Sequence, residues 1–203
     1  MLWLDAARRT GVVCRLVAAS IALAAAAAPA QSRGDAARGQ AQAEACGQCH
    51  GSPERPPLAG MPYLAGQSAQ FLELQLILMR EGLRDVPQMA VFLKGLTDLD
   101  ISDLAAHFAR QVSPRNTAKR NLALHARGAE LAKAMICGNC HGEDFLGQKH
   151  VPRLAGQRED YLAASLKAYR NNKRTGIDTS MNDMMYGVSD RDIEALAHFL
   201  AHQ

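Results

Sequence analysis

Four of the five cysteines stand in two short motifs, in each of which a histidine directly follows the second cysteine. The motifs lie at residues 46–50 and 137–141, and both read Cys-x-x-Cys-His. Two thiols at this spacing can each add to one vinyl group of the same porphyrin, and the imidazole that follows can bind the iron. The sequence therefore predicts two covalently bound haem c groups, with His50 and His141 as proximal iron ligands. The thioether bonds are assigned to Cys46, Cys49, Cys137 and Cys140.

Three other uses of paired cysteines compete with haem attachment. A thioredoxin-like redox pair needs a βαβ context, which the pattern around these motifs does not supply. A structural zinc site could use four thiolates, but it would leave the two histidines in register unexplained. A disulfide between cysteines at this spacing has no need of a repeated histidine. Haem attachment accounts for both cysteines and the histidine that the two motifs share.

The second axial ligand is expected to be methionine. Met89 lies eight residues before Thr97, and Met181 lies eight residues before Ser189, so the two occupy matching positions after the two motifs. A thioether ligand raises the potential of haem iron. The neighbours that compete with Met181 for the second iron are Met184 and Met185.

The other methionines and histidines have no counterpart at the matching position. Core packing is the ordinary role of methionine, and it is expected for Met61, Met79 and Met135. A second histidine could bind iron instead of methionine. The histidines outside the motifs are His107, His125, His150, His198 and His202.

Prolines and glycines near the motifs suggest supporting roles. A ligating imidazole needs a partner for its other ring N–H, and the carbonyls of Pro62 and Pro152 are candidate acceptors. Gly39 and Gly128 are expected to let the first and last helices of each half cross closely.

The segments around the motifs recur in the same order, about 90 residues apart. Beside the motifs, residues 37–39, 62–67 and 95–101 recur at 126–128, 152–157 and 187–193. Ordered matches of this kind indicate a duplicated domain. The predicted domains are residues 31–117 and 118–203, with a turn or linker near residues 113–119.

Each copy is predicted to be helical. Alanine-rich segments approach both motifs, apolar residues at helical spacing mark a middle helix, and an amphipathic helix follows Thr97 and Ser189. Both caps carry Asp three residues later, where Glu or Gln is usual, so an imperfect capping box is expected. No segment shows convincing strand alternation. The predicted fold is all-α, with each small domain wrapped around a haem that supplements its core.

Composition and the N-terminus place the chain among exported proteins. It has 203 residues, 48% of them apolar, and a formal charge of +3, so nucleic acid is not an expected partner. Residues 1–30 resemble a cleaved signal peptide, with arginines, a short apolar run and a small-residue site ending at Ala30. Cys14 would be lost with it. An uncleaved membrane anchor is the alternative, but the apolar run is short for a bilayer span.

Over residues 35–202 the chain resembles the dihaem cytochrome c4 family and, more broadly, class I cytochromes c. The two Cys-x-x-Cys-His motifs, the paired Pro-x-Leu-Ala-Gly-Gln segments, Met89, Met181 and the two helix starts carry this resemblance. The resemblance implies two tandem cytochrome c domains about a pseudo-two-fold axis and periplasmic electron transfer. Residues 52–61 are proline-rich and differ from the corresponding loop of the second copy, so the two haem pockets need not be equivalent.

Three possible functions remain open on the sequence. A diffusible carrier would exchange single electrons between a donor dehydrogenase or bc1-type complex and a terminal oxidase or reductase, with transient docking to membrane complexes. An enzyme such as a dihaem peroxidase would need one iron without a distal ligand. A third alternative is the dihaem subunit of a dehydrogenase, as in flavocytochrome c sulfide dehydrogenases. The matched methionines favour the carrier.

Overall fold

The computed structural model describes residues 34–52, 55–175 and 177–203. All of these residues fall within one compact unit, Ser32–Gln203. The predicted signal peptide, with Cys14 and Ala30, lies outside the described residues. Within the described residues, none of the helices combines the length and apolar character required to cross a bilayer.

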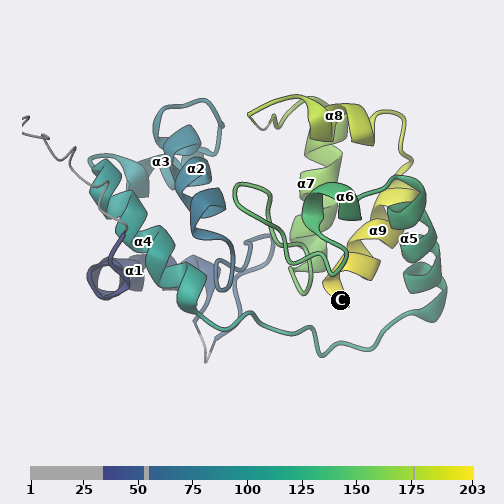
Figure 1. Ribbon diagram of the computed structural model, residues 1–203, viewed down its shortest axis with the longest axis horizontal. Coiled ribbons are helices and arrows are strands. Elements are labelled where there is room, and N and C mark those ends of the chain that lie inside the picture. Colours follow the sequence, from purple (N-terminus) through teal and green to yellow (C-terminus); the bar gives the residue numbers. More distant parts are fainter. Residues whose placement is uncertain (1–33, 53–54, 176) are drawn as a thin grey trace, which may run out of the picture. The chain divides into compact units, whose positions relative to one another are not determined.

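The described residues form helices and loops, and their only β-pairing is two isolated bridges, Ser52 with Arg55 and Gln148 with Val151. The all-α prediction is confirmed. The first repeat contains α1 (Ala36–His50), α2 (Ala69–Arg80), α3 (Pro87–Leu93) and α4 (Asp98–Arg110). The second repeat contains α5 (Leu122–Ala134), α6 (Gly138–His141), α7 (Glu159–Arg170), α8 (Ser180–Met185) and α9 (Asp190–Ala201) (Figure 1).

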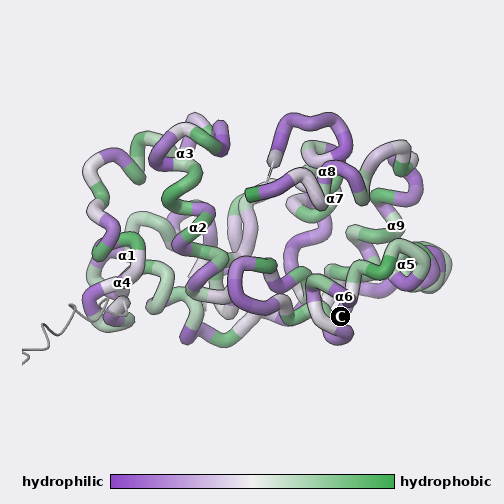
Figure 2. Tube along the Cα trace, turned by 45° about the horizontal axis from the view of Figure 1, so that its top comes forward, coloured by the Kyte–Doolittle hydropathy of each residue, from purple (hydrophilic) through white to green (hydrophobic). Residues whose placement is uncertain are grey.

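Each repeat has its own cluster of buried apolar side chains. In the first, Leu72 of α2 packs with Leu104 of α4, and in the second, Leu162 of α7 packs with Leu196 of α9. These leucines match in the repeat, so the same helix faces build both cores. Apolar residues of α2 appear as a green stretch of the Cα trace in Figure 2. Burial of these faces supplies the main driving force that holds each repeat together.

The first and last helices of each repeat cross at a glycine, as predicted. A Cβ placed on Gly39 of α1 would lie 2.0 Å from the carbonyl oxygen of Asp103 in α4. A Cβ on Gly128 of α5 would lie 2.1 Å from the carbonyl oxygen of Ala195 in α9. Real side chains do not tolerate such distances, so only glycine permits this backbone approach.

Gly39→Ala is expected to lower the free energy of unfolding by about 1–3 kcal/mol, because the added methyl group must push α4 away from α1. Gly47→Ala is the matched control, since it lies in the same helix and its Cβ would meet no atom within 4 Å. Denaturant unfolding of the holoprotein measures both. Equal stability of the two variants would show that the close crossing does not constrain the fold.

The two terminal helices begin at the predicted caps. At α4 the Thr97 hydroxyl accepts the Asp100 N–H at 3.2 Å, and the Asp100 carboxylate accepts the Thr97 N–H at 2.8 Å. This capping box is complete, so the prediction of an imperfect box was wrong here: the Asp side chain is long enough to reach. At α9 the Ser189 hydroxyl accepts the Asp192 N–H, and the Asp192 carboxylate accepts from the Ser189 hydroxyl and from Arg127 rather than from the Ser189 N–H.

The approach to the second motif differs from the first by two extra residues. Seven positions separate Gly39 from Cys46, whereas nine separate Gly128 from Cys137. Helix α1 runs unbroken to its histidine, but α5 ends at Ala134 and the chain loops outward at Ile136, which has φ 49° and is 59% exposed. The outward loop absorbs the insertion, because a continuous helix would rotate the motif away from the core.

Candidate functional site

The histidines of the two motifs make the same hydrogen bond. Nδ1 of His50, at the end of α1, lies 3.0 Å from the carbonyl oxygen of Pro62. Nδ1 of His141, at the end of α6, lies 2.9 Å from the carbonyl oxygen of Pro152. The predicted proline acceptors are therefore confirmed. A carbonyl can only accept, so each Nδ1 carries the hydrogen and each Nε2 keeps a free lone pair.

These two imidazoles are in the form that binds a metal. Burial lowers the pKa of His50 and of His141, although the bond to the proline carbonyl opposes this shift. Among the described residues, nothing hydrogen-bonds to Nε2 of either ring. A neutral imidazole whose orientation is held through Nδ1 is the usual arrangement of a ligating histidine.

None of the four cysteines of the motifs takes part in a disulfide. Cys46 and Cys137 pack against the apolar clusters of their repeats, and burial raises the pKa of both thiols. Cys140 is exposed. The one group of metal-ligating side chains found in the described part of the chain is Glu159, His198 and His202, and it includes no cysteine. The structure thus gives no support to the disulfide or zinc alternatives.

The predicted methionine ligands occupy equivalent short helices that the sequence analysis did not anticipate. Met89 lies in α3 and Met181 in α8, each between the middle and last helices of its repeat, and both are half-buried. Met185 is 2% exposed within the second core, and its counterpart Leu93 is equally buried, so this position serves packing. Met184 is 39% exposed. Met181 therefore remains the better candidate of the three.

Most histidines outside the motifs have other partners. Nδ1 of His198 binds Glu159, and its Nε2 accepts the Asn121 N–H at 3.0 Å. His107 binds Gln111, and His202 binds the His198 carbonyl. No pair of these histidines occupies matching positions in the two repeats.

One buried and two half-buried arginines supply positive charge that no carboxylate of the described residues neutralises. Arg153 is 5% exposed, and its Nε and Nη2 have no hydrogen-bond partner. Arg174 leaves its Nε unpaired while its guanidinium lies 4.8 Å from the centre of the Tyr169 ring. Arg84, which matches Arg174 in the repeat, binds Gln75. None of these arginines belongs to an ion pair among the described residues.

The electrostatic effect of Arg174 and Arg84 is visible at Tyr161. Although burial raises its pKa, the positive charges of Arg174 and Arg84 lower the pKa of this tyrosine to about 8. Burial also lowers the pKa of Arg153 and of Arg84. Unpaired buried guanidinium groups are costly unless an anion joins them. The carboxylates of a haem fit this requirement, so Arg153 and Arg174 are suited to hold them.

None of these arginines was predicted from the sequence as a functional residue. The available signal was the recurrence of Arg84 as Arg174 in the repeat register. Arg153 has Tyr63 at its matching position, so its role depended on knowing that it is buried.

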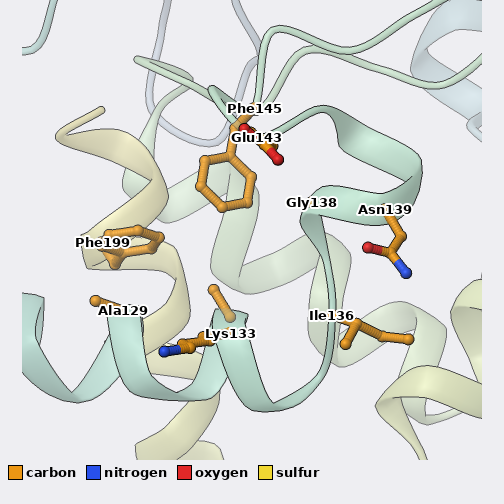
Figure 3. Close-up of a pocket in the computed structure, with 9 residues that line it drawn as sticks. Ala129, Lys133, Ile136, Gly138, Asn139, Glu143, Phe145 and Phe199 are labelled. Atoms are coloured by element: carbon orange, nitrogen blue, oxygen red, sulfur yellow. The ribbon is translucent and has the colours of Figure 1, made fainter.

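A cavity of about 330 Å³ lies beside the second motif (Figure 3). Phe145 and Phe199 meet edge to face above α5, with ring centroids 5.5 Å apart, and Gly138 and Asn139 are the two residues between the motif cysteines. The lining includes none of the predicted iron ligands. We therefore do not assign the cofactor to this cavity.

Known proteins resemble this chain in sequence and fold over most of its length. A model of the cytochrome c family matches residues 125–203. Cytochrome c4 of Pseudomonas aeruginosa is 35% identical over 180 residues, covering 84% of this chain and 90% of that protein. A thiosulfate dehydrogenase electron acceptor of Stutzerimonas stutzeri is 33% identical over 174 residues, covering 79% of each. The crystal structure of reduced recombinant cytochrome c4 from Pseudomonas stutzeri matches with a TM-score of 0.77 at 30% identity, covering 83% of this chain and 98% of that chain.

A duplicated helical fold with two attachment motifs and two neutral, oriented imidazoles defines a dihaem c-type cytochrome. The chain belongs to the cytochrome c4 family. It accordingly carries two covalently bound haem c groups and is an electron-transfer protein rather than an enzyme. When bound, haem iron exchanges a single electron between its ferric and ferrous states. The partners of this chain are redox proteins.

Proposed function

We propose that the chain is a periplasmic carrier whose two irons are each held by histidine and methionine. The thioether bonds are made by Cys46 and Cys49 in the first repeat and by Cys137 and Cys140 in the second. The iron ligands are His50, Met89, His141 and Met181. The observation that carries this proposal is the matched Nδ1 bond to Pro62 and Pro152, which leaves both Nε2 lone pairs free.

The domain boundaries and the export route belong to the same proposal. Residues 31–117 and 118–203 form the two haem domains, and residues 1–30 are the signal peptide, cleaved near Ala30. The separate apolar clusters of the two repeats support this division. The family supports the location, since haem c proteins of this kind act outside the cytoplasm.

The donor is a dehydrogenase or a bc1-type complex, and the acceptor is a terminal oxidase or reductase. Thiosulfate dehydrogenase is a specific candidate for this dehydrogenase, because a relative with 33% identity is itself an electron acceptor for such an enzyme. As the haem subunit of a dehydrogenase, the chain would receive electrons from one fixed partner instead of diffusing between two.

Spectra of the exported holoprotein with and without carbon monoxide test the carrier assignment. We expect two haems per chain, both low-spin in both oxidation states and unchanged by carbon monoxide, because two protein ligands fill both axial positions. A high-spin fraction that binds carbon monoxide, or turnover of peroxide, would instead support the peroxidase alternative.

A second experiment identifies the donor. It compares reduction of the protein by thiosulfate with a thiosulfate dehydrogenase and reduction by quinol with a bc1-type complex.

A further inference from the structure

Two buried glutamines link the repeats by matching hydrogen bonds. The Gln67 side chain accepts the Arg153 N–H at 3.0 Å and donates to the Arg153 carbonyl at 2.7 Å. The Gln157 side chain accepts the Tyr63 N–H at 2.8 Å and donates to the Tyr63 carbonyl at 2.9 Å. The two glutamines match in the repeat, as do the two residues they bind. Both glutamines are nearly inaccessible, at 4% and 3% exposure.

Each glutamine acts on the residue next to the proline that holds a motif histidine. The Pro62 carbonyl and the Tyr63 N–H belong to one peptide group. The carbonyl accepts from Nδ1 of His50, and the N–H donates to Gln157 of the other repeat. His141, Pro152, Arg153 and Gln67 form the same chain in the opposite direction.

A peptide group transmits both position and polarisation. It is planar and rigid, so an anchor at its N–H fixes the direction of its carbonyl. Hydrogen bonds in series polarise one another, so an acceptor at the N–H makes the carbonyl a stronger acceptor for the imidazole. The electron density of each imidazole therefore depends on a side chain of the other repeat.

We propose that Gln157 is a positioning residue for His50 and that Gln67 is a positioning residue for His141. This inference rests on the proposed function, in which these histidines bind iron. Each glutamine then sets the reduction equilibrium of the haem in the opposite repeat. The bonds also couple the two repeats. A displacement of residues 62–67 or of residues 152–157 changes the support of the histidine ligand in the other repeat.

The test uses the intact holoprotein with Gln157→Met and Gln67→Met, and with the exposed Gln70→Met as the matched control. NMR of the ferrous protein measures the Nδ1–H signals of both histidines, and potentiometry measures the two reduction steps. Gln157→Met should move the His50 signal and leave that of His141 in place, and Gln67→Met should do the reverse. Loss of polarisation leaves the imidazole less electron-rich, so reduction at the affected haem becomes about threefold to tenfold more favourable, or ~28–59 mV. Gln70→Met should change neither.

Gln157→Glu separates positioning from simple packing and serves where a methionine variant does not fold. It keeps an oxygen acceptor for the Tyr63 N–H but loses the N–H that donates to the Tyr63 carbonyl, so the His50 signal should move by less than in Gln157→Met. A shift as large as that of Gln157→Met, shifts confined to the histidine of the same repeat, or no shift in Gln157→Met would overturn the proposal. The unsubstituted protein checks the proposed function separately: if His50 or His141 does not bind iron there, that function fails, whereas intact ligation with unresponsive signals defeats the glutamine proposal alone.

Discussion

Replacing Cys137 and Cys140 together with serine is expected to yield a chain with one haem instead of two. Serine hydroxyls do not form the thioether bonds, so the second repeat can no longer retain its porphyrin covalently. The mass of the exported chain should fall by one haem, and the haem absorbance per chain should fall to about half. The second repeat should also lose stability, because Cys137 packs against its apolar cluster.

The corresponding change of Cys46 and Cys49 should remove the other haem, and all four changes together should give a colourless protein. Cys14→Ser is the control, since this residue lies in the predicted signal peptide. Mass spectrometry of the denatured protein measures covalent haem directly. Two haems retained after loss of both cysteines of one motif would refute the attachment assignment.

Replacing Met89 or Met181 with histidine is expected to lower the potential of one reduction step by about 0.2 V, a fraction of the roughly 0.8 V that axial ligands span. Histidine does not provide the thioether that favours ferrous iron. Each single change should leave the other step nearly unaltered, and the double change should lower both. Potentiometric titration of the holoprotein provides the measurement.

Met184→Leu and Met185→Leu are the matched controls for the second haem. Met184 is 39% exposed, and Met185 occupies a packing position that matches Leu93 in the first repeat. Neither change should therefore alter the reduction potential of the second haem appreciably. If Met184→Leu or Met185→Leu lowered a reduction step while Met181→His left both in place, Met181 would lose its assignment to the other methionine.

The best-predicted features depend on residues close together in the chain. Helices α4 and α9 begin one residue after the predicted caps at Thr97 and Ser189, because capping is a contact between residues three apart. The middle helices α2 and α7 were visible in their apolar spacing. Helices α3 and α8 were not predicted, since six or seven residues provide too few turns to show a period.

The proline acceptors illustrate what repetition adds to local reasoning. Pro62 and Pro152 lie at nearly the same distance after their motifs, and the chemistry of imidazole requires an acceptor, so both bonds were predictable. The glutamines recurred just as regularly at 67 and 157, yet their partners lie in the opposite copy. A repeat pattern says which residues are equivalent but does not say whether a contact forms within one copy or between two.

Short-range spacing was thus sufficient for the helical class and the haem chemistry, because thioether formation, capping and helix amphipathicity all act over a few residues. The recurrence of that spacing indicated the duplication. The packed chain decided three further features: the buried guanidinium nitrogens of Arg153 and Arg174 that have no partner, the separation of Met181 from Met185, and the exchange of glutamine bonds between repeats. These features bring together groups that are far apart in sequence, and their energies depend on which polar atoms lose water when the repeats fold against each other.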